Sequence, residues 1–341
     1  MDTHFENALA ALSYAGEQDK TALDREKTTA VYYAQDHQFF NTFKELFFIQ
    51  PIYSEHIKLL NSGFSVFARM PKRSVNRVIY FAQKHKEKTF ADLADIADYL
   101  SENGILLFVA PKAIGGRSIA EWVIKLFGQG EIISKRHSVV CAVRKSSATI
   151  DRNILNIWQS YGQKKIVEGG YFTRAGVFSS ERIDQGSKIL IETIANEALD
   201  KEIADFGAGY GYISKELLNR YSNITKMALY EADYNALELA KENIIDKRSE
   251  YHWSDITDYS LAKRFDAVVM NPPFHSGYKK DSAVGEAFIK AAAKALKKDG
   301  RLYLVANRKL GYETLLKELF NKTLIMCQKD GYKVIKCHLK Q

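Results

Sequence analysis

The chain is poor in cysteine and has no long apolar run. Its three cysteines, Cys141, Cys327 and Cys337, form no Cys-x-x-Cys pair and no metal-binding spacing with the eight histidines. This argues against a metal site and predicts buried, reduced thiols. No stretch approaches the roughly 20 apolar residues that span a bilayer, and the amino terminus lacks the basic and apolar regions of a signal peptide. We therefore expect a cytoplasmic protein that binds neither metal nor membrane.

Charge of one sign is only in modest excess. The 49 lysines and arginines outnumber the 41 aspartates and glutamates, for a net charge of +8, and no basic tail concentrates them. Such a surface suits a polyanionic partner because phosphate contacts release counterions, but it does not identify one. Low-complexity tracts are absent, and 341 residues predict two globular domains.

Strand-like apolar runs alternate with helical patterns from about Ile183 onward, which predicts an α/β fold with a parallel sheet. A helix is expected from the N-cap Asp184 through Leu199. Further strands are expected at Glu202–Phe206, Lys226–Glu231, Glu250–Trp253, Phe265–Met270 and Arg301–Ala306, with helices near Tyr212–Tyr221, Tyr234–Ile244, Ser282–Leu296 and Tyr312–Phe320. Thr323–Cys327 and Tyr332–Leu339 should form a closing hairpin around a Lys-Asp-Gly turn.

The first half carries a weaker echo of the second at an offset of about 190 residues. The matches are Val78–Phe81 with Ala267–Met270, Gly104–Ala110 with Gly300–Ala306, Leu126-Phe127 with Leu319-Phe320, and Ser138–Lys145 with Tyr332–Lys340. Unrelated α/β domains can share such spacing, yet four matches in order indicate an internal duplication. We predict a degenerate first domain without a cofactor site at residues 1–165 and a catalytic domain at residues 166–341.

A glycine-rich turn follows the strand Glu202–Phe206 and contains Gly207, Ala208 and Gly209. Glycines let the backbone bend tightly and let a ligand lie against it, although dinucleotide and phosphate sites use similar turns. Asp205, two residues before the first glycine at the end of the strand, would repel a pyrophosphate but attract the ammonium group of a methionine moiety, directly or through water. The turn therefore favours an aminoacyl ligand.

Two further acidic residues suit an adenosine. Glu231, about 20 residues beyond the turn at the end of the next strand, can accept hydrogen bonds from both ribose hydroxyls, as in NAD sites. Asp255 could accept from the adenine amino group, with Trp253 or Ile256 beside the ring. A turn explains the polar residues around Asp255 equally well.

The strand Phe265–Met270 is followed by Asn271, Pro272, Pro273 and Phe274. An exocyclic amine on a base is a poor nucleophile because its lone pair is delocalised into the ring. The Asn271 side-chain oxygen and the Pro272 carbonyl can accept its two N–H bonds, prolines hold the acceptors, and Phe274 offers a face for an unstacked base. The other interpretation is a rigid loop start, in which Asn271 and Phe274 are incidental.

These motifs, together with Gly176-Val177-Phe178-Ser179 and Asp184-x-Gly186-Ser187, resemble the RsmC-type small-subunit ribosomal RNA guanine-N2 methyltransferases over most of the chain. The resemblance implies a class I Rossmann-like domain that uses S-adenosylmethionine, with Phe178 closing over the cofactor. It also implies a first domain that assists folding or RNA binding, and action on assembled small subunits by a monomer. Ala208 replaces the usual cysteine of the family, and Asp255 stands where asparagine also occurs; neither removes an essential ligand.

Three alternatives stay open from the sequence. A guanine-N2 methyltransferase of large-subunit ribosomal RNA shares the layout and the motif. DNA adenine or protein glutamine methyltransferases usually have tyrosine at the fourth motif position, and Phe274 argues against both. A non-catalytic RNA-binding or assembly protein with this fold would be expected to lose the glycine turn or Asn271–Pro273, and both are intact. His275 could relay a proton, contact RNA or be a bystander.

Overall fold

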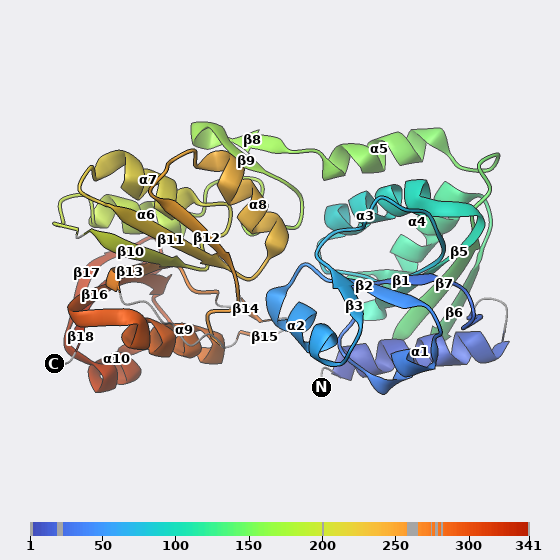
Figure 1. Cartoon of the computed structure of the whole chain (residues 1–341), viewed down its shortest axis with the longest axis horizontal. Helices are drawn as coiled ribbons and strands as arrows, with labels where there is room; N and C mark the ends of the chain where they lie inside the picture. The colour runs from blue at the N-terminus through green and yellow to red at the C-terminus, as the bar shows by residue number, and fades with distance from the viewer. Residues whose placement is uncertain are drawn as a thin grey trace. The chain divides into compact units, whose positions relative to one another are not determined.

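The structure is a computed structural model that describes residues 3–18, 23–199, 201–257, 265–273, 275–276, 279–280 and 282–339. Its contacts separate two compact units (Figure 1). Unit 1 comprises Met1–Lys164 and Arg174–Gly176, and unit 2 comprises Lys165–Thr173 and Val177–Gln341. Across the described ranges, no helix combines the length and the apolarity needed to cross a bilayer.

Unit 1 contains one seven-stranded sheet. Its strands are β1 (Thr29–Tyr32), β2 (Leu46–Ile49), β3 (Ser65–Phe67), β4 (Val75–Phe81), β5 (Leu100–Pro111), β6 (Glu131–Lys135) and β7 (Ser138–Arg144). Its α-helices are α1 (Thr3–Gln18), α2 (Tyr53–Asn61), α3 (Lys86–Tyr99), α4 (Gly116–Phe127) and α5 (Arg152–Gly162). Two short 3-10 helices are η1 (Gln38–Thr42) and η2 (Lys112–Ile114). The order is β3-β2-β1-β4-β5-β7-β6. The first five strands are parallel, and β7 pairs antiparallel with both of its neighbours.

Unit 2 contains a second seven-stranded sheet. Its strands are β10 (Glu202–Phe206), β11 (Lys226–Glu231), β12 (Ser249–Trp253), β13 (Phe265–Met270), β16 (Leu296–Asn307), β17 (Phe320–Lys329) and β18 (Tyr332–Leu339). Its helices are α6 (Gln185–Thr193), α7 (Tyr212–Arg220), α8 (Tyr234–Asn243), α9 (Ser282–Ala295) and α10 (Glu313–Leu319). Shorter pieces are β8 (Lys165–Val167), η3 (Glu168–Gly170), β9 (Tyr171–Thr173), β14 (His275–Ser276) and β15 (Lys279–Lys280). The order is β12-β11-β10-β13-β16-β18-β17.

The two sheets have the same topology, which confirms the predicted fold class and the internal duplication. The four sequence matches fall on β4 and β13, on β5 and β16, on the ends of α4 and α10, and on β7 and β18. β5 and β16 even share one pattern of buried and exposed positions. In each, a left-handed residue, Asn103 or Asp299 (φ 62° in both), precedes the glycine at the bend. The likeness therefore extends to local backbone conformation.

The strands of unit 2 are apolar because helices cover both faces of the sheet. Ala204, Val268 and Leu302 pack with α9 and α10 on one face. The residues that alternate with these along each strand, such as Ile203, Ala267 and Tyr303, pack with α6, α7 and α8 on the other face. This arrangement explains why the strands read as continuous apolar runs rather than as alternating ones.

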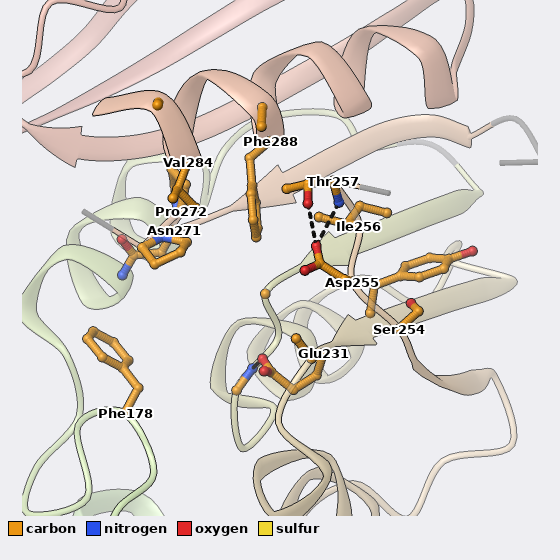
Figure 2. Close-up of a pocket in the computed structure, with 17 residues that line it drawn as sticks. Phe178, Glu231, Ser254, Asp255, Ile256, Thr257, Asn271, Pro272, Val284 and Phe288 are labelled. Carbon is orange, nitrogen blue, oxygen red and sulfur yellow. Dashed lines mark hydrogen bonds between the residues drawn. The ribbon is translucent and has the colours of Figure 1, made fainter. Parts of the chain in front are cut away.

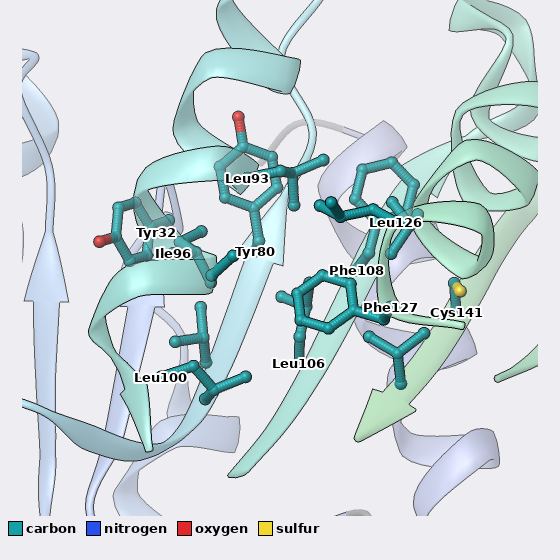
Figure 3. Packing of buried hydrophobic residues seen from close by; sticks show 14 of the residues in the cluster. Tyr32, Tyr80, Leu93, Ile96, Leu100, Leu106, Phe108, Leu126, Phe127 and Cys141 are labelled. Carbon is teal, nitrogen blue, oxygen red and sulfur yellow. The ribbon is translucent and has the colours of Figure 1, made fainter. Parts of the chain in front are cut away.

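Unit 1 has the same kind of core (Figure 3). Leu106 and Phe108 of β5 pack with Leu126 and Phe127 of α4 in one buried cluster. Cys141 lies in this cluster, and burial raises the pKa of its thiol to about 12. All three cysteines are unpaired, as expected, although Cys327 is only partly buried.

Several predicted boundaries were wrong, by the largest margins at α6, β16 and β17, and β17 spans Phe320–Lys329 rather than Thr323–Cys327. α6 ends at Thr193 rather than at Leu199, because the N–H of Ile194 bonds to two carbonyls of the last turn and tightens it. Leu199 is buried all the same. β16 begins at Leu296 rather than at Arg301, because Leu296 already pairs with Phe265 of β13. At α6 and β16 a buried leucine, Leu199 or Leu296, had been assigned to the preceding helix.

Replacing Leu302 with alanine tests the packing of unit 2. Leu302 has no exposed surface, so we expect Leu302→Ala to lower the free energy of unfolding by about 2–5 kcal/mol. Leu324→Ala is the control, because Leu324 is 49% exposed and its loss should cost only about 0.5 kcal/mol. Urea unfolding combined with hydrogen exchange of β13 and β16 measures both. Equal effects of the two substitutions would contradict this description of the core.

Candidate active site

Three neighbouring strands of unit 2 end at one edge of the sheet. β10 lies between β11 and β13 and is parallel to both, so Phe206 is level with Tyr230 on one side and with Met270 on the other. Glu231 is the last residue of β11, and Gly207 and Asn271 directly follow β10 and β13. Ligands of open α/β sheets bind in the crevice outside such strand ends. The register therefore brings the three predicted motifs together.

A cavity of about 610 Å³ opens at this edge (Figure 2). Its lining contains most of the predicted site residues, namely Phe178, Gly207, Gly209, Glu231, Asp255, Asn271, Pro272 and Pro273. A smaller adjoining hollow of about 40 Å³ is lined by Ala208, Asp184 and Ser187, and it shares Phe178, Asn271 and the glycine turn with the larger one. Figure 2 shows Asn271 and Pro272 on one side of the cavity and Glu231, Ser254 and Asp255 on the other, with Phe288 between them.

The glycine turn is held by backbone hydrogen bonds. Gly207 and Gly209 have left-handed φ angles of 74° and 56°, which favour glycine. The N–H groups of Gly207 and Ala208 donate to the Tyr230 carbonyl at 2.9 and 3.1 Å. A Cβ at Gly207 would lie 3.2 Å from the Phe288 ring, whereas the space around Gly209 is open. A ligand can therefore lie directly against the backbone of this turn.

Glu231 is positioned by two backbone donors. The Gly209 N–H donates to Oε2 at 2.7 Å, and the Asp233 N–H donates to Oε1 at 2.8 Å. Burial raises the pKa of this carboxyl to about 7. Asp233 itself caps α8, as expected. Each oxygen of a carboxylate has a second lone pair, so Glu231 retains acceptors for a ligand in the cavity.

Asp205 lies deeper than the sequence suggested. Its side chain has no exposed surface and is absent from the lining of both cavities. Its Oδ2 accepts from the Ser214 hydroxyl at 2.7 Å. Oδ1 is buried and has no hydrogen-bond partner among the described residues, and burial raises the pKa of Asp205 to about 7. The expected direct contact with a ligand is not available in this arrangement, because the strand holds the carboxyl inside; a contact through water stays a prediction.

Asp255 forms a turn and also lines the cavity, so both interpretations of it apply. Its Oδ1 accepts from the backbone N–H and the hydroxyl of Thr257 at 2.9 and 2.6 Å. Ile256 is the apolar neighbour that reaches the cavity. Trp253 does not line it: its Nε1 donates to the Ala232 carbonyl at 2.9 Å, and its ring packs against Tyr234.

One face of α9 lines the cavity, and the sequence analysis did not predict this. Ala283, Val284, Ala287 and Phe288 line the cavity. Their spacing of three and four residues marks one helix face, but such an apolar face is equally typical of a helix that packs on a core. The aromatic residue predicted for this region, Phe274, lies outside the described residues. His275 belongs to β14.

The Asn271 side chain is held through its nitrogen. Nδ2 donates to Oδ2 of Asp184 at 2.7 Å and to Oγ of Ser187 at 2.9 Å. Neither bond uses the amide oxygen, which remains an acceptor beside the buried Pro272. The predicted acceptor group and the glycine turn thus line the same cavity, which is the arrangement that methyl transfer to an amine requires.

The sheet order, the glycine turn after its first strand, the acidic residue at the end of its second and the Asn-Pro-Pro run after its fourth define a class I methyltransferase that depends on S-adenosylmethionine. Residues 169–336 match the family model of the methyltransferase small domain. The carboxy-terminal unit therefore matches the methyltransferase small domain over most of its length.

Whole-chain comparisons agree with this assignment. The chain is 27% identical to ribosomal RNA small subunit methyltransferase C of Psychromonas ingrahamii, over 77% of this chain and 76% of that one. It is 28% identical to the protein of the same name from Hahella chejuensis, over 76% of each. The solved structure of the T. thermophilus 16S rRNA N2 G1207 methyltransferase (RsmC), in complex with AdoMet and guanosine, has a TM-score of 0.76. It is 20% identical, and the match covers 92% of this chain and 88% of that one. The resemblance to the RsmC type is confirmed.

Cofactor affinity should depend on pH through Glu231. In the role expected for Glu231 the carboxylate is the form that accepts from ribose hydroxyls, and the raised pKa of about 7 means that acid removes this form. Binding of S-adenosylhomocysteine should therefore weaken as pH falls through 7, by about tenfold between pH 8 and pH 6. Calorimetry at the two pH values measures this. Glu231→Gln should bind more weakly at pH 8 and show a smaller pH dependence; an unchanged dependence would contradict the assignment.

Proposed function

We propose that this protein methylates the exocyclic N2 amine of a guanine in 16S ribosomal RNA, with the assembled small subunit as its substrate. The observation that carries the chemistry is the Asn271 amide, held by its nitrogen at a cavity that also contains the glycine turn. The choice of RNA is supported by the names of the similar proteins. The T. thermophilus structure contains AdoMet and guanosine, which supports a cavity that receives both a cofactor and a base.

The residues after β13 make the amine reactive. The Asn271 Oδ1 and the Pro272 carbonyl accept the two N–H bonds of the guanine amine, which directs the nitrogen lone pair out of the ring system. S-adenosylmethionine, when bound, supplies a methyl group on a positively charged sulfur. The amine nitrogen forms the new bond to carbon as the carbon–sulfur bond breaks, and the nitrogen then loses a proton to solvent. Catalysis by this chain is mainly positioning, so no strong base is needed.

The cofactor roles that we propose follow the two ends of the cavity. Glu231 accepts from the ribose hydroxyls, and Asp255 accepts from the adenine amino group beside Ile256. The turn Gly207–Gly209 lies against the methionine portion, which Asp205 attracts through water, with its unpartnered Oδ1 as the acceptor. Phe178, which is 57% exposed at the cavity, closes over the bound cofactor.

The net charge of +8 suits an RNA substrate. Because the proposed substrate is an assembled ribosomal subunit, we place the enzyme in the cytoplasm, and we propose that it acts as a monomer. The first unit is proposed to assist folding or RNA binding without a cofactor of its own.

Asn271→Ala tests the proposed chemistry. The variant loses one of the two acceptors, so kcat on unmethylated small subunits should fall by about 100-fold or more. Binding of S-adenosylhomocysteine should stay within about twofold, because the glycine turn and Glu231 are untouched. Asn321→Ala is the matched control, since this exposed asparagine donates to the Leu339 carbonyl and does not line the cavity.

Nucleoside mass spectrometry supplies the second half of this test. Cells that lack the protein should lose N2-methylguanosine at one position of 16S ribosomal RNA. Loss of the mark from large-subunit RNA instead would reassign the substrate. Near-normal turnover by Asn271→Ala, or no binding of S-adenosylhomocysteine by the unaltered protein, would refute the catalytic assignment.

A further inference from the structure

We infer that Asp184 and Ser187 are positioning residues that select which end of the Asn271 amide faces the substrate. This inference rests on the proposed function, because it concerns the orientation of the acceptor that binds the guanine amine. It assigns a role in turnover to two side chains of the α6 start, a segment that precedes the glycine turn in the chain.

The Asn271 amide can adopt two orientations, and only one of them supports the proposed reaction. Its oxygen and nitrogen are similar in size, and rotation about the terminal torsion exchanges them at small steric cost. Only the oxygen can accept an N–H from the guanine amine. If the Asn271 nitrogen faced the substrate, its N–H groups would point at the N–H groups of the guanine amine. No hydrogen bond could then form, and the amine would be neither held nor activated.

Asp184 resolves this ambiguity electrostatically. A carboxylate has no donor, so its Oδ2, 2.7 Å from Nδ2 of Asn271, favours the amide nitrogen on that side. The reversed amide would place two acceptor oxygens at the same distance. Ser187 Oγ, at 2.9 Å, accepts the second N–H of the amide. Because both amide hydrogens are used, the oxygen is the group left for the substrate.

Asp184 and Ser187 are brought together by the first turn of α6. Asp184 caps α6, and the oxygen that bonds Asn271 also accepts from the Ser187 N–H at 2.8 Å. A Cβ at Gly186 would lie 3.0 Å from that oxygen and 2.9 Å from the Tyr332 ring. Glycine therefore keeps the capping carboxylate free to reach Asn271. The Asp-x-Gly-Ser spacing thus serves both the helix and the active site.

A test must separate orientation from helix capping. Asp184→Ser does so, because serine is a good N-cap but its shorter side chain does not reach Asn271. We expect its kcat on unmethylated small subunits to fall roughly 10- to 100-fold, the effect of losing a hydrogen bond to a charged group. The KM for subunits and the affinity for S-adenosylhomocysteine should stay within about twofold.

Two further variants act as controls. In Asp184→Asn the Ser187 N–H keeps an oxygen at the same place, so both hydrogen bonds persist and kcat should recover to within roughly fivefold of the unaltered protein. Asp151→Ser makes the same cap substitution at α5, where Asp151 accepts from the N–H groups of Asn153 and Ile154. Its kcat should not change.

The orientation can also be followed without turnover. The side-chain NH2 protons of Asn271, assigned by their loss in Asn271→Ala, should exchange slowly with solvent in the unaltered protein and rapidly in Asp184→Ser. Full kcat in Asp184→Ser, or loss of S-adenosylhomocysteine binding together with kcat, would overturn the positioning role. Absence of methyl transfer by the unaltered protein would instead overturn the proposed function, and the proton exchange would still report whether Asp184 orients the amide.

Discussion

The active site depends on the parallel pairing of β10 with β13. Because these strands run side by side in one direction, the turn after Phe206 and the loop after Met270 leave the same edge of the sheet. A ligand held against the turn must then lie close to Asn271. The pairing sets this proximity before any side chain is considered, and an insertion that shifted the register would separate the cofactor from the acceptor.

The same pairing exists in unit 1, where β1 lies beside β4. The residues after these strands differ. Near them in unit 1, the hydroxyls of Tyr33 and Tyr80 donate to one carboxylate, Asp92, at 2.8 and 2.9 Å, and Lys88 pairs with it. These polar groups satisfy one another. In unit 2 the corresponding edge presents acceptors to a cavity, so the two units differ in the groups that surround the same pair of strands.

Much of this arrangement was predictable from local pattern. β10, β11, β13 and β18 have the expected bounds, because each is a short apolar run between turn residues. Asp184 and Asp233 cap helices as expected, since capping is a property of a few adjacent residues. Local pattern could not reveal the bond between Asp184 and Asn271, which are 87 positions apart. Local pattern also could not reveal that α9 lines the cavity or that the Asp205 side chain is fully buried. Burial depends on the elements that pack around a residue.

The two buried carboxylates have a consequence for folding. In the folded chain the pKa values of Asp205 and Glu231 are about 7, above the ordinary values of 3.8 and 4.5. As pH rises from about 4 to 7, the folded state keeps protons that the unfolded state releases, so the empty protein loses stability over this interval. A ligand that donates hydrogen bonds to Glu231 restores part of what the burial of that carboxyl costs. At neutral pH the free energy of unfolding of unit 2 should therefore increase with the concentration of its cofactor.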